Sequence, residues 1–88
     1  MFAIGFDLVV KDTLAYADIG SVLTQYDFER VQGSLYLTKN DDLANLFAAI
    51  MALKGLAWFP PSVRDIRAFK VEHWSDFTRF VKTSQTTS

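Results

Sequence analysis

The chain has 88 residues, a net charge of −1 and no cysteine, and half of its residues are apolar. This length allows one domain, and the apolar content excludes a chain that stays unfolded. The lack of cysteine excludes a disulfide framework, a thiolate nucleophile and a zinc finger. Nine basic residues against ten acidic ones exclude strong nonspecific binding of nucleic acid. No apolar run reaches the roughly 18 residues of a membrane span, and residues 1–7 lack the basic start of a signal peptide. We therefore expect the protein to be located in the cytosol.

The first predicted element is a strand over residues 2–10, where apolar side chains recur at every second position. One face should pack under helices and consists of Phe2, Ile4, Phe6, Leu8 and Val10. The opposite face is made of small residues, Val9 and a single carboxylate, Asp7. The strand therefore predicts one covered face and one face with a different role.

A helix should follow from near Leu14 to near Tyr26, capped by Asp12 or Thr13. Its apolar stripe is predicted to comprise Leu14, Ala17 or Asp18, Ile19, Val22 and Leu23. Residues 28–37 resemble a β-hairpin, and the bend lies at Gln32-Gly33 because glycine adopts positive φ without a steric cost.

A second helix is predicted over residues 42–54, with Asn40 or Asp41 as its N-cap and Gly55 at its C-terminal end. Residues 57–61 could pair as a short edge strand, although two prolines remove hydrogen-bond donors. The last strand covers residues 63–71. A closing helix over residues 75–82 should turn its large apolar side chains inward, namely Trp74, Phe77, Phe80 and Val81. We expect residues 1–82 to form one domain and residues 83–88 a disordered tail.

This order of elements predicts an α+β fold, the ferredoxin-like β-α-β-β-α-β sandwich with an extra C-terminal helix and a four-stranded antiparallel sheet. Both main helices then cover one face of the sheet. The other face stays bare in a monomer, so it is a candidate surface for a homodimer.

Asp7 is the first candidate for chemistry, because aspartate is depleted within strands. On the uncovered face of a dimer, two copies of Asp7 would approach each other and could hold a divalent cation or share a proton. A structural explanation competes on equal terms: the carboxylate could accept a bond from a backbone amide or from Arg67.

Ser34 and Tyr36 share a face of the hairpin's second strand, because they are two residues apart. If this strand lies beside the first one, we expect their face to continue the face of Asp7. A carboxylate, a hydroxyl and a phenol would then form a polar site. Ordinary strand composition also explains both residues, with serine at a hairpin and tyrosine as a strand former. This is the favoured interpretation from the sequence alone.

Arg64 and Arg67 begin the last strand, with Asp65 between them. The two guanidinium groups could bind phosphate, or an Arg–Asp pair could order the loop after the prolines. His73 is the single histidine and is a weak candidate for acid–base chemistry. Trp58, Phe59, Trp74 and Phe77 could stack on bases, but core positions explain them better.

Three segments resemble virulence-associated protein D. They are the start Met1-Phe-Ala-Ile-Gly-Phe-Asp-Leu8, the hairpin Gln32-Gly-Ser-Leu-Tyr36 and the block Ser62-Val-Arg-Asp-Ile-Arg-Ala-Phe-Lys-Val71. The run Glu72-His-Trp-Ser-Asp-Phe-Thr78 continues the match. The resemblance covers roughly residues 1–82, and its motifs occur in the same order. Residues 11–16 depart from the pattern, because relatives have a longer segment there.

The resemblance implies a fold similar to the small CRISPR-associated endoribonucleases, a homodimer and a cytoplasmic location. It implies an endoribonuclease that acts as an mRNA-cleaving toxin beside a small antitoxin protein. Asp7 corresponds to the family's candidate catalytic residue, and Ser34 is also implicated in the site. The assignment of Tyr36, Arg64 and Arg67 to substrate binding rests on the residues themselves.

The sequence therefore favours RNA cleavage, with Asp7 as a general base or as a ligand of a metal ion such as Mg²⁺. The sequence does not establish a required cofactor. The alternative is a non-catalytic homodimeric interaction module regulated by a small partner protein. A scaffold for duplex DNA is less favoured, because the chain is slightly acidic.

Overall fold

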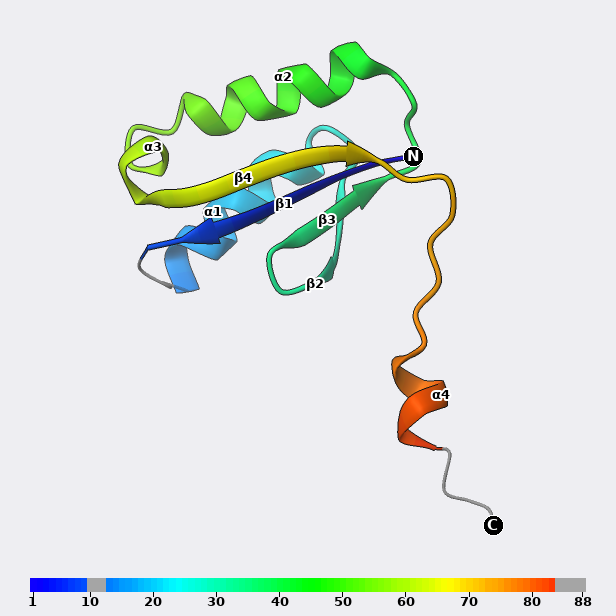
Figure 1. The fold of residues 1–88 in the computed structure, drawn as a ribbon. Helices are drawn as coiled ribbons and strands as arrows, with labels where there is room; N and C mark the ends of the chain where they lie inside the picture. The colour runs from blue at the N-terminus through cyan, green and yellow to red at the C-terminus, as the bar shows by residue number, and fades with distance from the viewer. Residues whose placement is uncertain (10–12, 84–88) are drawn as a thin grey trace.

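The computed structural model describes residues 1–9 and 13–83. A four-stranded antiparallel sheet and four helices follow one another in the predicted α+β order (Figure 1). The elements are β1 (Phe2–Leu8), α1 (Thr13–Thr24), β2 (Glu29–Gln32), β3 (Leu35–Thr38), α2 (Leu43–Lys54), α3 (Phe59–Ser62), β4 (Val63–Lys70) and α4 (Thr78–Lys82).

The sheet has the strand order β2-β3-β1-β4, so β1 lies in the interior and pairs with both β3 and β4. In this register Ile4 lies opposite Tyr36 on β3 and opposite Ala68 on β4. Gly5 lies opposite Leu35 and Arg67. Because side chains alternate along a strand, each such row of residues belongs to one face of the sheet.

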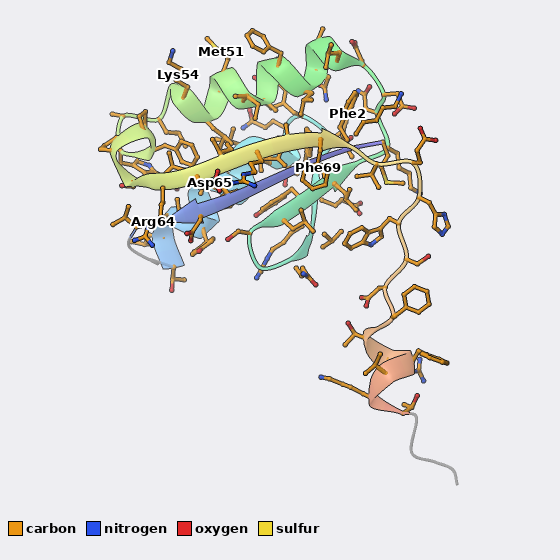
Figure 2. All side chains as sticks on the ribbon, in the orientation of Figure 1. Phe2, Met51, Lys54, Arg64, Asp65 and Phe69 are labelled. Atoms are coloured by element: carbon orange, nitrogen blue, oxygen red, sulfur yellow. The ribbon has the colours of Figure 1, made fainter. Side chains whose placement is uncertain are left out.

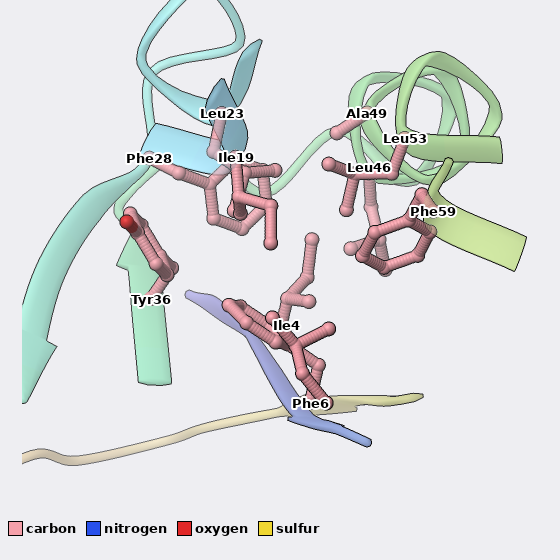
Figure 3. Packing of buried hydrophobic residues seen from close by; sticks show 11 residues of the cluster. Ile4, Phe6, Ile19, Leu23, Phe28, Tyr36, Leu46, Ala49, Leu53 and Phe59 are labelled. Atoms are coloured by element: carbon pink, nitrogen blue, oxygen red, sulfur yellow. The ribbon is translucent and has the colours of Figure 1, made fainter. Parts of the chain in front are cut away.

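The hydrophobic core lies between the sheet and the helices α1 and α2 (Figure 3). From β1 it contains Ile4, Phe6 and Leu8, which the sequence predicted for the covered face. Val10, predicted for the same face, lies outside the described residues. From the helices the core contains Ile19, Leu23, Leu46, Ala49, Leu53 and Phe59. We call this side of the sheet the helix face and the opposite side the open face.

The hairpin prediction is confirmed, with β2 and β3 joined at Gly33, whose φ is 43°. Helix α1 begins where predicted but ends at Thr24, earlier than expected. Its predicted stripe is wrong at Leu14, which is 74% exposed, and at both alternatives Ala17 and Asp18, which are exposed, whereas Ile19 and Leu23 are buried. The proposed cap Asp12 lies outside the described residues.

The N-cap of α2 is Asp42, whose carboxylate accepts a hydrogen bond from the Ala44 amide, so the prediction of Asn40 or Asp41 is wrong. Asn40 lies before the helix and orders the turn that leads into it, because its side chain accepts a hydrogen bond from the Asp42 amide. Gly55 ends the helix as predicted, but with a right-handed φ of −72°. Residues 57–61, which could have paired as a short edge strand, instead form a turn that leads into α3 at Phe59, and this helix accepts proline in its first turn.

The C-terminal part departs most from the prediction. The last helix begins at Thr78 rather than Ser75, and its apolar side chains are exposed rather than turned inward. Figure 1 shows residues 71–82 extending away from the sheet as an arm, with α4 at its end. Of the tail predicted to be disordered, residues 84–88 lie outside the described part. Within residues 1–9 and 13–83, no helix is long and apolar enough to cross a membrane.

Candidate functional site

Two carboxylates meet on the open face of the sheet. Asp7 on β1 and Asp65 on β4 are direct partners across the antiparallel pair, so their side chains point to the same side. Asp7 is half-buried, and Asp65 is exposed. A β-bulge follows immediately, between Asp7 and Leu8, so the cluster lies where the regular pairing of the two strands ends.

Arg67 lies beside this pair, one step along the same face. Its Nε donates a hydrogen bond to an Asp65 carboxylate oxygen at 3.2 Å. The two terminal amino groups of the guanidinium therefore remain for another acceptor. The structure thus contradicts one explanation of Asp7, since Arg67 pairs with Asp65 and no described residue donates a hydrogen bond to the Asp7 carboxylate.

These residues surround a hollow of about 270 Å³ lined by Gly5, Phe6, Asp7, Asp65, Arg67 and Phe69. Gly5, which has no side chain, lies between Asp7 and Ala3 on this face of β1. Phe69 forms the far end and is about half exposed (Figure 2). The hollow therefore presents a proton acceptor, a cation and an aromatic ring on one surface.

The described residues contain no cluster of three or more histidine, aspartate or glutamate side chains that could hold a metal ion. Asp7 and Asp65 supply two carboxylates, which is the number that Mg²⁺ commonly takes from a protein when phosphate oxygens and water complete its shell. The described side chains alone therefore do not form a metal site in the hollow, and a magnesium ion there would need phosphate oxygens and water as further ligands.

Ser34 and Tyr36 do not join Asp7, so the expectation that they continue its face is wrong. Tyr36 pairs with Ile4, and the Ser34 carbonyl accepts a bond from the Phe6 amide at 3.2 Å. Ser34 and Tyr36 therefore point to the same side of the sheet as the core residues Ile4 and Phe6, which is the helix face. The physical reason is that the Tyr36 ring stacks on Phe6, with ring centroids 6.1 Å apart, and is buried in the core.

The hydroxyls on the helix face form a second polar group. Ser34 Oγ donates to Tyr16 Oη at 3.4 Å, which joins β3 to α1. Tyr36 is 5% exposed, and its hydroxyl lies against Gly20, where an added Cβ would approach it to 3.2 Å. Burial raises the pKa of Tyr36 above its ordinary value of 10.0, and the charge of Arg30 partly offsets this.

Arg64 lies in the β-bulge, because the pairing passes from Asp65 directly to Val63. It is exposed at the start of β4 (Figure 2). His73 is also exposed, and its Nε2 shares a hydrogen bond with Ser75 Oγ at 2.9 Å. Of the four aromatic residues considered for stacking, Phe59 is in the core and Trp58 packs against it, but Trp74 and Phe77 are exposed.

Two members of these clusters were missed as functional candidates. Asp65 was treated only as a partner of the neighbouring arginines, although its spacing from Arg67 and Phe69 places all three on one face of a strand. Tyr16 gave no signal in the sequence, because its contact with Ser34 depends on how α1 packs on the sheet.

The chain was compared with known proteins. No protein-family model matches it. It is 59% identical to the Endoribonuclease VapD homolog of Neisseria gonorrhoeae and 57% identical to Endoribonuclease VapD of Haemophilus influenzae, in each case over 93% of this chain and 99% of the relative. It is 43% identical to Endoribonuclease VapD of Helicobacter pylori, again over 93% of this chain. These identities extend over nearly the full length of both proteins, and the chain belongs to the VapD family.

Proposed function

We propose that the protein is an endoribonuclease that cleaves RNA in the hollow on the open face. The observation that carries this proposal is the half-buried carboxylate of Asp7, which lies beside Arg67 in an accessible hollow and receives no hydrogen bond from a described residue. The names of the relatives, all called endoribonucleases, supply the substrate class.

In the proposed mechanism Asp7 acts as the general base. Its carboxylate takes a proton from the ribose 2′-hydroxyl or from a water molecule, and the resulting oxygen attacks the adjacent phosphorus. The bond from this phosphorus to the leaving ribose oxygen breaks, and that oxygen takes up a proton from solvent water. The free amino groups of Arg67 bind the phosphate oxygens and stabilise the charge that develops on them. Phe69 provides a surface on which a neighbouring base can stack.

Asp65 has a supporting role in this proposal, because its bond to Nε of Arg67 fixes the guanidinium beside Asp7. A magnesium ion would be held by Asp7 and Asp65, and it would supply positive charge to the phosphate.

We also propose a homodimer formed through the open face. Next to the hollow this face is apolar: Phe69 is exposed and Leu35 is partly exposed, whereas Ala3 and Leu37 are already buried within one copy. Two such faces would pack about 10 Å apart, as stacked sheets do. A face-to-face arrangement brings the two hollows toward each other.

A cellular role follows from the resemblance to virulence-associated protein D. We propose that the enzyme is a cytoplasmic toxin of a toxin–antitoxin pair, held inactive by a small protein partner. Expression of the chain without that partner should then arrest growth, and the Asp7→Asn variant should not. Growth arrest by both proteins would contradict a role that depends on cleavage.

The test of the site compares purified wild type with Asp7→Asn and, as a matched control, Asp18→Asn on the exposed surface of α1. We expect Asp7→Asn to lower RNA cleavage by about 10²–10⁴-fold, because the general base is lost, while Asp18→Asn retains full activity. Both variants should melt like wild type.

The same assay, run with magnesium and with a chelator, separates a base from a metal ligand. An RNA whose 2′-hydroxyl is replaced by hydrogen at the cleaved position shows whether that hydroxyl is the nucleophile. Equal cleavage by wild type and Asp7→Asn would contradict the assignment of Asp7 as the catalytic base. No cleavage by any of them would favour the interaction module.

A further inference from the structure

The C-terminal arm carries large apolar side chains into solvent. Phe77 and Phe80 are 64% and 72% exposed, and their rings pack edge to face with centroids 6.4 Å apart. Helix α4 has only five residues, far fewer than an isolated helix needs to be stable in water. The two rings therefore form a compact, exposed apolar patch of the kind that usually packs against another surface.

A matching surface lies on α2. Leu43, Phe47 and Met51 recur every four residues along this helix and are all exposed. Beside them, an apolar groove of about 610 Å³ runs between α2 and β4 and is lined by Leu43, Ala44, Leu46, Phe47, Ile50 and Ala68. Figure 2 shows Met51 on the side of α2 that points away from the sheet. We call this the α2–β4 groove.

The arm leaves the body on the side opposite to its own α2–β4 groove. Trp74 lines a groove on the open face together with Val31 and Leu37. Helix α2 packs on the helix face, on the other side of the sheet (Figure 1). At the start of the arm, Trp74 therefore lies against the open face, which is the face that a second copy would contact, and the rest of the arm extends away from the sheet.

The length of the arm suits a second copy. From Val71 to Phe77 the chain spans at most about 20 Å, and stacked sheets lie about 10 Å apart. β4 is an edge strand, so an arm from the partner can pass this edge and enter the groove beside Ala68. Charge does not add to this argument, because Asp41 pairs with the N-terminal ammonium group of Met1 and the Asp42 carboxylate caps α2.

We propose that two copies of this chain exchange their C-terminal arms, each placing Phe77 and Phe80 of its arm in the α2–β4 groove of the other. This inference rests on the homodimer of the proposed function but not on RNA cleavage. It assigns an occupant to a helix surface that the face-to-face contact of two sheets leaves uncovered.

The test uses the absence of cysteine from the full chain. One copy carries Phe80→Cys and a second copy, with a different tag, carries Phe47→Cys. After mixing and mild oxidation, we expect a disulfide that joins the two tags. Phe80→Cys mixed with Ser21→Cys, an exposed position on α1, is the matched control and should give little product. A product with Phe69→Cys on the open face that exceeds the Phe47→Cys product would overturn the proposal.

A single chain with both Phe80→Cys and Phe47→Cys distinguishes exchange from folding back. Exchange predicts disulfide-linked dimers, whereas a disulfide within one chain at high dilution would overturn the proposal. In sedimentation experiments, Phe80→Asp and Phe47→Asp should each weaken the dimer by about tenfold or more, because either change puts a charge in the buried contact. Unchanged dimerisation in both variants would also overturn it. Neither readout involves RNA, so a failure here is separate from a failure of the proposed nuclease.

Discussion

The two faces of the sheet divide stability from chemistry. On the helix face, Ile4, Phe6 and Leu8 of β1 are buried under α1 and α2. On the open face the alternating positions of the same strand hold Ala3, Gly5 and Asp7. A single strand thus supplies the core and the candidate base, because neighbouring side chains point in opposite directions.

Polar groups are treated differently on the two faces. On the helix face Ser34 and Tyr16 satisfy each other, and the Tyr36 hydroxyl is buried against α1. On the open face Arg67 and Asp65 are paired but exposed, and Asp7 lies beside them. The comparison predicts that substitutions on the helix face act mainly on folding, and substitutions on the open face act on binding and catalysis.

The largest effect on stability should come from Phe28→Ala. This side chain is almost completely buried, and its removal should cost about 3–5 kcal/mol of a total stability of about 5–15 kcal/mol. The matched change Phe69→Ala on the open face should alter the unfolding free energy of the monomer by less than about 0.5 kcal/mol. Urea denaturation at low protein concentration measures both, and equal losses would contradict the division between the faces.

Arg67→Ala should have the next largest effect, and it should act on cleavage rather than folding. Loss of the guanidinium removes the charge that stabilises the phosphate, which should lower kcat by about 100-fold. Arg64→Ala is the control, because Arg64 lies in the bulge and not in the hollow. Steady-state kinetics with both variants would reject the assignment if Arg64→Ala were the more damaging change.

Much of this fold follows from the sequence because its signals are local. The alternation of β1, the spacing of Leu46 and Leu53 on α2, and Gly33 in the hairpin each reflect a few neighbouring residues. The arm was mispredicted because Phe77 and Phe80 have the apolar spacing of a buried helix, and the sequence does not say which surface buries them. In α1, Leu14 shares that spacing, but its position at the start of the helix leaves it exposed.

The candidate site was less predictable than the fold, because it depends on register. Asp7 could be singled out from its place in a strand, but Asp65 becomes its partner only through the antiparallel pairing of β1 with β4. Ser34 and Tyr36 were placed on the wrong face for the same reason, since a shift of one residue in pairing moves a side chain to the opposite side.

A smaller effect tests the role of Ser34, which the family resemblance places in the site. Ser34→Ala and Tyr16→Phe remove the two ends of one hydrogen bond, so each should lower the unfolding free energy by about 0.5–1.5 kcal/mol. The double variant should lose no more than either single one. The same cycle with cleavage as the readout shows whether Ser34 acts through Tyr16. Fully additive losses would mean that the two hydroxyls act independently.

The smallest effect concerns Tyr36, whose hydroxyl lies on the helix face. Tyr36→Phe should leave cleavage unchanged, since the phenol does not reach the hollow with Asp7. A clear loss of activity would mean that Tyr36 takes part in substrate binding after all.

The raised pKa of Tyr36 predicts a second effect, on stability. The folded state holds the phenolic proton more tightly than the unfolded state, so this stability is fully present below a pH of about 10 and is lost as pH rises through the folded pKa. The unfolding free energy of wild type should therefore fall more steeply above this pH than that of Tyr36→Phe. Parallel curves from urea denaturation would show that burial does not perturb this group.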